Sequence, residues 1–459
     1  MSHVIVCEHA SLTTEACSPS LSLARVSPTA FDYLCQLSEG FKRSGASLLQ
    51  IEGQQRLRLD GYVGVIQTPC GTTVEVLPKH MDAEAPEAAP ACRRLLRKLI
   101  QSFFDVPSRE VGAASLETFK LPLHEWLMQR FVEELDRIVQ RGVRFSYQRV
   151  EEEQPFLRGQ LNVVAQLRQP PGRAHHFQIR HDVFTPDRPE NRLLRAALER
   201  VRKLTQQPDT WRLAQELSLR LADIPVSTQI EADFKAWRND RLVAHYQAAR
   251  PWCELILRQM MPLAVHGSTQ GMSLLFPMEK LFERHVAAWL RSRLDPACRV
   301  RTPAASQYLC RQGLTDMFRL EPDILVEHGP KRKWVLDAKW KVLDETDRGS
   351  KFGLSQADFY QLFAYGQKYL GGVGNMALIY PMSTKFTKAM TPFDFSADMR
   401  LHVLPFDMES DRLVGTAELK LPMSQAADEL PQVHSIAADT AEAAQSECNV
   451  ATQPRVSTC

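Results

Sequence analysis

The sequence lacks any apolar run long enough to cross a membrane, and its cysteines lack the spacing of a metal site. A transmembrane helix needs about eighteen or more apolar residues in a row, and no such run occurs in the 459 residues. The ten cysteines include no CxxC pair or other zinc-binding spacing, and the N-terminus shows no basic-then-apolar signal pattern. We therefore expect a cytoplasmic protein with reduced thiols and no contact with a membrane.

An excess of one charge and a nucleotide-binding loop are also missing. The formal net charge is only +2, so a basic surface for nucleic acid would have to be local. The pattern G-x-x-x-x-G-K-[ST], which cradles the phosphates of a bound nucleotide, does not occur. We therefore expect this chain itself to bind no nucleotide.

Hydrophobic periodicity divides the chain, whose length predicts two or three domains. Residues 1–165 mix strands and helices, and we expect them to form an α+β domain. The elements expected there are a hairpin around Pro69-Cys70-Gly71, helices over 92–105 and 122–141, and a strand over 143–150 that the acidic stretch 151–153 and Pro155 should end.

The rest of the chain changes character twice. Residues 166–264 are typical of a helical connecting segment, in which Pro251 should kink or split the last helix. Residues 265–415 alternate helix, strand, strand, helix, strand, strand, which predicts an α/β domain. Residues 421–459 are rich in Ala, Ser, Gln, Glu and Asp and nearly free of aromatics, so we expect them to be disordered.

Two short β-rich runs carry acidic residues where a strand normally buries apolar ones: "RLEPDILVE" (319–327) and "WVLDAKWKVLD" (334–344). If they form an antiparallel hairpin centred on Pro330, Asp323 faces Asp337 with Cβ atoms about 5 Å apart. Two carboxylates so close repel each other unless a cation lies between them, and Mg²⁺ often binds through one or two carboxylates. Lys339 shares the face of Asp337, opposite an apolar face, and would lie beside the metal-bound water. The alternative is a half-exposed strand in which Asp337 and Lys339 form a weak surface pair.

A third carboxylate fits the same site. In the helix expected over 276–294, Glu279 falls in line with Phe282, Val286 and Leu290, so it should point toward the core. A buried carboxylate needs a partner, and the metal would supply one. The alternative is a salt bridge between Glu279 and a basic neighbour near the start of the helix.

The helix expected over 355–370 has a polar stripe. Gln361, Tyr365 and Lys368 share one of its faces. Amide, phenol and ammonium groups beside a metal site are suited to holding a DNA backbone. The alternative is an ordinary amphipathic helix with a solvated face.

In this order, Glu279, Pro322-Asp323, Asp337-Ala338-Lys339 and the Gln361 to Tyr365 spacing resemble the PD-(D/E)xK nuclease pattern with its helical QxxxY element. Other segments resemble McrC, the nuclease subunit of the McrBC modified-cytosine restriction system. They are "GVIQTPCGTTVEVLPKH", "FLRGQLNVVAQL" and "PDRPENRLLRAALERV", and the resemblance runs from about residue 60 to about residue 410.

The resemblance implies an α/β restriction-endonuclease-like domain, a mixed sheet flanked by helices, that follows the α+β domain and the helical segment. It implies Mg²⁺-dependent cleavage of methylcytosine-containing double-stranded DNA, together with an McrB-like AAA+ GTPase ring that the N-terminal part contacts and stimulates. One or two Mg²⁺ ions would be held by Asp323, Asp337, the Ala338 carbonyl and Glu279, and Lys339 would orient the attacking hydroxide. The residues expected to contact DNA are Gln361, Tyr365, Lys331, Arg332 and Lys333.

Two other functions stay open at this point. The chain could be an autonomous repair or recombination nuclease of the same fold, which would cut DNA without a partner. It could instead be a non-catalytic regulator of an AAA+ ring, although a scaffold has no reason to keep Asp323, Asp337 and Lys339 on strand faces.

Overall fold

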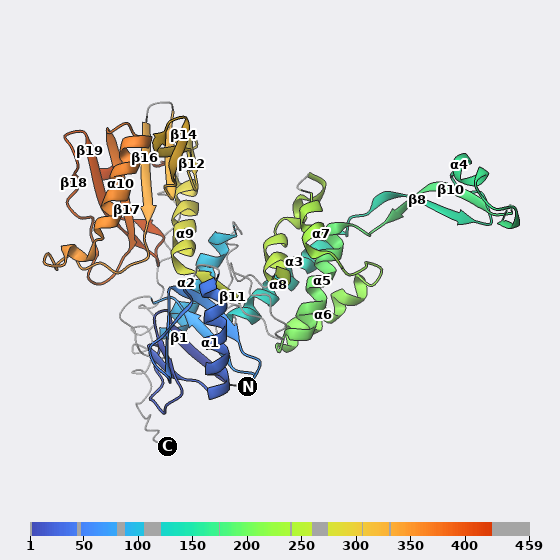
Figure 1. Cartoon of the computed structure of the whole chain (residues 1–459), viewed down its shortest axis with the longest axis horizontal. Coiled ribbons are helices and arrows are strands. Elements are labelled where there is room, and N and C mark those ends of the chain that lie inside the picture. The colour runs from blue at the N-terminus through green and yellow to red at the C-terminus, as the bar shows by residue number, and fades with distance from the viewer. Residues whose placement is uncertain are drawn as a thin grey trace, which may run out of the picture.

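The computed structural model describes residues 2–43, 47–79, 88–104, 121–173, 175–238, 241–258, 274–304, 306–329 and 332–424. They form an N-terminal unit of two small sheets, a helical unit with a long β arm, and a C-terminal α/β unit (Figure 1). No helix in these ranges is long and apolar enough to cross a membrane. Most of the segment expected to be disordered, residues 425–459, lies outside the described residues.

The N-terminal unit contains two four-stranded sheets. The expected hairpin around Pro69-Cys70-Gly71 is confirmed, because β6 and β7 pair antiparallel across it. The last strand of that sheet, β11, comes from a distant part of the chain and lies close to Gly64, where a Cβ atom would be 1.9 Å from the carbonyl oxygen of Leu274. The elements are β1 (His3–Cys7), β7 (Thr73–Leu77), β6 (Tyr62–Gln67) and β11 (Leu274–Pro277) in one sheet, β3 (Leu23–Arg25), β2 (Ser11–Thr13), β5 (Arg56–Leu59) and β4 (Leu49–Ile51) in the other, and helix α1 (Pro28–Arg43).

The helical unit is built from five α-helices: α3 (Leu123–Arg141), α5 (Pro189–Leu204), α6 (Pro208–Arg220), α7 (Ile230–Ala236) and α8 (Arg250–Arg258). Helix α3, which we expected in the N-terminal domain, contacts β6 of the N-terminal unit and packs mainly against α5, α6 and α8. The last helical segment of this unit is split, as Pro251 predicts. It forms a 3-10 helix (Arg241–Tyr246) followed by α8, and Pro251 lies in the first turn of α8.

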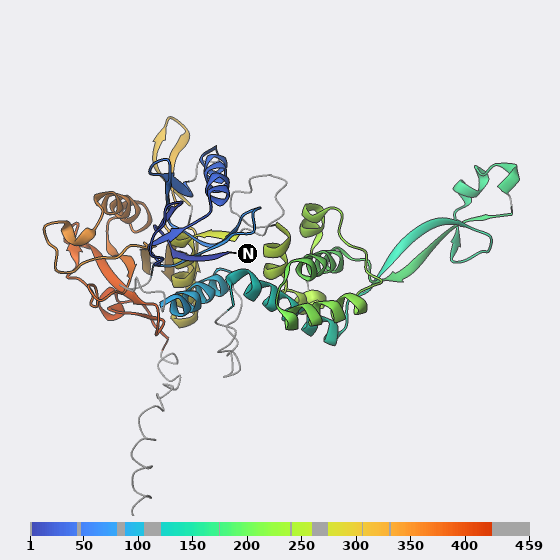
Figure 2. The same ribbon diagram turned by 90° about the horizontal axis from the view of Figure 1, so that it is seen from below.

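A long arm leaves the helical unit and extends away from the rest of the protein (Figure 2). It consists of β8 (Ser146–Gln154), β10 (Phe177–Thr185), the short β9 (Gln160–Leu161) and helix α4 (Val163–Leu167). The expectation that Glu151–Glu153 end the strand is wrong, because β8 continues to Gln154. The acidic residues are tolerated there because Glu151 faces Arg180 across the ladder and forms an ion pair with it.

The C-terminal unit is a mixed sheet between two helices, which matches the expected layout. Helix α9 (Met278–Arg293) packs on one face and α10 (Gln356–Tyr369) on the other. The strand order is β12 (Cys298–Arg301), β15 (Ile324–His328), β16 (Arg332–Ala338), β17 (Gly374–Pro381), β19 (Met399–Asp407) and β18 (Phe393–Asp394), and β20 (Arg412–Leu413) also pairs with β19. Strands β13 (Gln307–Gln312) and β14 (Thr315–Leu320) form a separate hairpin. Helix α11 (Thr416–Leu419) follows β20 in the sequence. Strands β15 and β16 are antiparallel, whereas β16 and β17 are parallel.

One hydrophobic core passes through all three units. Helix α2 (Ala89–Phe103) packs on α9 and thereby joins the N-terminal unit to the C-terminal unit. Leu99 of α2, Phe131 of α3, Phe282 of α9 and Leu336 of β16 all belong to the same buried cluster. The C-terminal sheet is therefore held from outside its own unit.

Candidate active site

The hairpin that carries the two aspartates has the expected register. Ile324 pairs with Leu336, and His328 pairs with Arg332, so the pairing is centred on position 330. Asp323 lies one residue before β15, and its Oδ2 accepts a hydrogen bond of 3.1 Å from the backbone N–H of Ala338. The prediction that Asp323 lies beside the Asp337 end of β16 is confirmed.

Strand β16 has no exposed face at this point, which corrects one expectation. Leu336 and Ala338 lie in the core on the α9 side, and Val335 lies in the core on the α10 side. Asp337 is 0% exposed. Because β16 is a central strand with a helix over each face, Asp337 and Lys339 do not form the half-exposed surface pair of the alternative interpretation.

The charged side chains of the site change one another's pKa values. Nζ of Lys339 lies 2.8 Å from Oδ2 of Asp337, but neither oxygen of Asp337 accepts a hydrogen bond of ordinary geometry from the described residues. Burial, and then the charge of Asp323, raise the pKa of Asp337. Burial is the largest single influence on Lys339 and would lower its pKa, but the combined attraction of Asp337, Asp323 and Asp358 outweighs burial, so the pKa of Lys339 is raised.

The expected orientation of the third carboxylate is not observed. Glu279 is exposed in the first turn of α9, so the expectation that it points into the core is wrong. Glu283, one turn further along, is buried and forms an ion pair with Lys280. Burial and the charge of Glu283 raise the pKa of Asp323, so Glu283 acts electrostatically on the site. The i to i+4 spacing from Glu279 to Glu283 was visible in the sequence and is the signal that could have found it.

The QxxxY residues do not lie on the solvated stripe that was expected. Tyr365 is buried in the core on the α10 side, not on a solvated stripe with Lys368, which is exposed. The phenol O–H of Tyr365 donates to the carbonyl oxygen of Glu321 (3.1 Å) and accepts a bond of 2.6 Å from Nε2 of Gln361. A buried tyrosine needs such a partner for its hydroxyl. Tyr365 thus holds the backbone directly before Pro322-Asp323.

A second tyrosine of α10, which sequence reasoning missed, acts on the same segment. The hydroxyl of Tyr369 shares its hydrogen between the carbonyl oxygens of Ala304 (2.5 Å) and Leu320 (2.8 Å), and it accepts from the backbone N–H of Ser306 (3.2 Å). Its position one turn after Tyr365 was the available signal. The two tyrosines fix the chain that leads from β14 to Asp323.

The basic residues of the hairpin turn lie at the other end of the strand. Arg332 opens β16, and Asp337 follows five residues later, a distance of about 17 Å at the rise of a strand. Lys333 forms an ion pair with Glu327 (3.4 Å), and Lys331 lies outside the described residues. Arg332 and Lys333 therefore lie one strand length from the two aspartates, and their contact with DNA phosphates stays a prediction.

The residues fit a hard divalent cation. Asp323 and Asp337 are buried and repel each other, and Oδ1 of Asp337 has no hydrogen-bond partner among the described residues, so this oxygen is available to a cation. In the part of the chain that the structure describes, no group of three or more His, Cys, Asp or Glu side chains could hold a metal alone. Mg²⁺ accepts this situation, since it commonly combines one or two carboxylates with phosphate oxygens and water.

Comparisons with known proteins identify one family and one fold. The family described as "McrBC 5-methylcytosine restriction system component" matches residues 57–381. No curated protein matches the chain. One similar solved structure is the refined half-complex from the tetradecameric assembly of Thermococcus gammatolerans McrB AAA+ hexamers with bound McrC. A chain in it is 19% identical to this one with a TM-score of 0.64, and the match covers 88% of this chain and 95% of that chain. At this identity the likeness shows a shared fold. The cryo-EM structure of the Thermococcus gammatolerans McrBC complex contains a chain that is 19% identical with a TM-score of 0.49, over 63% of this chain and 87% of that one.

Proposed function

The chain belongs to the family of McrBC 5-methylcytosine restriction system components, and from this premise we propose that it is the nuclease subunit of such a system, a Mg²⁺-dependent endonuclease of the PD-(D/E)xK type. The observation that carries the proposal is the buried pair of Asp323 and Asp337 beside Lys339 at the end of β16. A buried charge cluster of this kind is costly for folding. Its position at the expected register supports a chemical role.

Each residue has a defined part in the proposed reaction, the hydrolysis of a phosphodiester bond of methylcytosine-containing DNA. Asp323 and Asp337, with the carbonyl of Ala338, would hold the ion, and Glu283 takes the supporting role first given to Glu279. When bound, the divalent ion supplies a hydroxide near neutral pH and polarises the phosphate. The ammonium group of Lys339 stabilises the negative charge that develops on the scissile phosphate. Tyr365, supported by Gln361, keeps Asp323 in place through the Glu321 carbonyl.

The proposed partner is an AAA+ GTPase ring. In the Thermococcus gammatolerans assembly, McrC is bound to McrB AAA+ hexamers, and this sequence has no phosphate-binding loop of its own. The arm tip, residues 155–176, offers a contact surface, because apolar side chains gather there in exposed positions: Phe156, Leu157, Val163, Val164 and Leu167. Exposed apolar patches of this kind mark protein interaction sites. We infer that the arm tip contacts the ring and supports its GTP hydrolysis.

The test separates the two activities of the proposal. Asp337→Ala and Lys339→Ala should each abolish cleavage of a methylcytosine-containing plasmid in the presence of the partner, GTP and Mg²⁺. Both variants should still stimulate the partner's GTP hydrolysis, because the arm lies on a different unit. If both variants cut the plasmid at the normal rate, the site assignment is wrong. Cleavage by the wild-type chain without any partner would instead support an autonomous nuclease.

A further inference from the structure

The side chain of Glu8, in the N-terminal unit, contacts the chain directly after strand β16. Glu8 directly follows β1 and is only 2% exposed. Its Oε1 accepts a hydrogen bond of 2.9 Å from the backbone N–H of Lys79 and one of 2.7 Å from the indole Nε1–H of Trp340. Trp340 is the residue after Lys339. A carboxylate of the first strand therefore contacts the neighbour of the proposed catalytic lysine.

The chain around Lys339 needs such an anchor because it is leaving the sheet. Strand β16 ends at Ala338, and the backbone N–H of Lys339 makes the last sheet-like bond, 2.9 Å to the carbonyl oxygen of Ile379. Beyond that point the indole of Trp340 packs against Phe282 of α9, with ring centroids 5.3 Å apart. The hydrogen bond to Glu8 adds a direction to this contact, which ring packing alone does not define.

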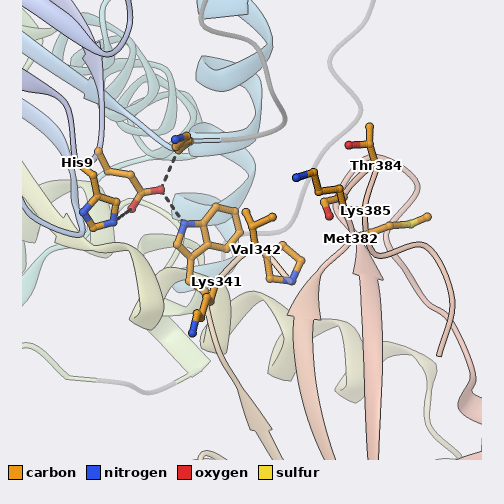
Figure 3. Close-up of a pocket in the computed structure, with 11 residues that line it drawn as sticks. His9, Lys341, Val342, Met382, Thr384 and Lys385 are labelled. Carbon is orange, nitrogen blue, oxygen red and sulfur yellow. Dashed lines mark hydrogen bonds and ion pairs between the residues drawn. The ribbon is translucent and has the colours of Figure 1, made fainter. Parts of the chain in front are cut away.

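A cavity next to the anchor makes the hydrogen bond more important. Trp340 and Glu8 line a cavity of about 330 Å³ between the N-terminal and C-terminal units. Figure 3 shows His9 on the N-terminal side of this cavity and Met382, Thr384 and Lys385 on the C-terminal side. The indole could move into such a space if its N–H were released, because an interior holds a side chain in place only where neighbouring atoms fill the volume.

We propose that Glu8 is a positioning residue for Lys339: by holding the indole of Trp340 it fixes the end of β16 and thus the place of the catalytic ammonium group. The proposal rests on the proposed nuclease function. It makes the active site composite, since Asp323, Asp337 and Lys339 come from the C-terminal unit and their alignment depends on a residue of the N-terminal unit.

The arrangement argues for positioning and against simple cohesion of two units. Oε2 of Glu8 is buried without a hydrogen-bond partner among the described residues, because Nε2 of His9 lies 4.0 Å away, beyond hydrogen-bond distance. Burying a carboxylate that is only partly satisfied carries a penalty, and an apolar pair would join the units without it. Unlike an apolar contact, the carboxylate of Glu8 fixes the orientation of the Trp340 indole, because a hydrogen bond has a preferred distance and angle.

Three variants of this contact test the proposal on the full chain, with the AAA+ GTPase partner, GTP, Mg²⁺ and a methylcytosine-containing plasmid. Glu8→Ala removes the acceptor, and Trp340→Phe removes only the N–H donor while keeping a ring against Phe282. Each should lower kcat by roughly ten- to a hundredfold with KM unchanged, as expected when a catalytic group is misplaced. Glu8→Gln keeps an acceptor oxygen at the same place and should restore most of kcat. The double variant Glu8→Ala with Trp340→Phe should be no slower than the slower single variant, because both remove one bond.

A matched control comes from α9. The indole Nε1–H of Trp289 donates to the carbonyl oxygen of Asp411 at 2.6 Å, so Trp289→Phe makes the same chemical change away from Lys339. It should leave kcat unchanged even if stability falls. The proposal is overturned if Glu8→Ala cuts as fast as wild type, if Glu8→Gln is as slow as Glu8→Ala, or if Trp289→Phe lowers kcat as much as Trp340→Phe.

A second measurement is independent of DNA cleavage and separates this inference from the proposed function. Amide hydrogen exchange in residues 337–341 should be faster in Glu8→Ala and Trp340→Phe than in wild type, and unchanged in Trp289→Phe. Unchanged exchange in the first two variants refutes the anchoring of β16 by Glu8. If the wild-type chain cuts no DNA under any condition, the proposed function fails, and the role of Glu8 toward a catalytic lysine fails with it, whatever the exchange rates show.

Discussion

Asp337 and Glu283 illustrate at the scale of single residues how the site concentrates charge. Asp337 is fully buried next to Lys339, and Asp323 accepts a hydrogen bond from the backbone N–H of Ala338, the residue between them. Glu283 adds a third carboxylate, which is held by Lys280 and raises the pKa of Asp323. Negative charge is therefore concentrated around a point where a cation would be stabilised, while Lys339 supplies the charge that a phosphate would meet.

Exchanging the two candidate carboxylates of α9 tests which one supports the site. Glu283→Gln should lower the cleavage rate by about ten- to a hundredfold, and it should raise the Mg²⁺ concentration needed for half-maximal cleavage, as loss of a group behind a metal ligand does. Glu279→Gln is the matched control, with the same change one turn earlier in an exposed position, and it should have no effect. Equal losses in both variants, or a loss only in Glu279→Gln, would contradict the placement of Glu283.

The elements differ in how well the sequence predicts them. The register of β15 and β16 follows from a turn centred on position 330, so the approach of Asp323 to Asp337 could be predicted from local pattern alone. The orientation of α9 could not, because α2 packs on this helix from one side and the sheet from the other. When most of a helix is buried, its apolar stripe no longer shows which side faces a given site. For this reason the apolar stripe indicates Glu279 as the carboxylate of the site and does not indicate Glu283.

The arm shows a second limit of local pattern. Strand β8 carries Glu151 and Glu153, and β10 carries Arg180 and Asp182, so neither has the clean apolar alternation of a strand that covers a core. Their stability comes from cross-strand pairing, which a single segment does not reveal. The base of the arm is fixed by Asn191, whose Nδ2 donates to the carbonyl oxygens of Arg144 and Pro186, each at 2.8 Å.

Removing the arm tip tests its role as an element. Gln154 and Phe177 are paired across the ladder, so a two-residue Asn-Gly turn can replace residues 155–176 and close the hairpin. Stimulation of the partner's GTP hydrolysis should be lost, because the exposed apolar side chains of the tip are gone. Leu219→Ser is the control, since Leu219 is an exposed leucine on α6 of the same unit, and it should stimulate normally. Full stimulation by the shortened chain would exclude the tip as the contact.

At the scale of the whole molecule, the units are interdependent. Strand β11 follows the helical unit in sequence but completes the N-terminal sheet, and α9 begins directly after it. Helix α2 covers α9 from outside the C-terminal unit, and Glu8 contacts Trp340. The C-terminal unit is thus contacted on two elements by segments from the first 103 residues.

This dependence predicts the behaviour of the isolated C-terminal unit. A fragment of residues 278–424 lacks α2 and exposes the side of α9 that packs against it. The fragment also lacks Leu95, Leu96 and Leu99, which belong to the same buried cluster as α9, and each fully buried leucine side chain contributes about 1.5–3 kcal/mol. The fragment should aggregate or unfold at a clearly lower temperature than the full chain in a thermal melt followed by circular dichroism. A fragment with the melting temperature and cleavage rate of the full chain would show that the C-terminal unit is autonomous.

The central claim is that Asp323 and Asp337 hold a divalent ion beside Lys339. A crystal structure of the full chain grown with Mn²⁺, with the ion located by its anomalous scattering, tests it most directly. The account predicts an ion bonded to both carboxylates in the wild-type chain and no ion at this place in Asp337→Asn. Anomalous density elsewhere with none between the two carboxylates, or an ion that persists in Asp337→Asn, would contradict the account.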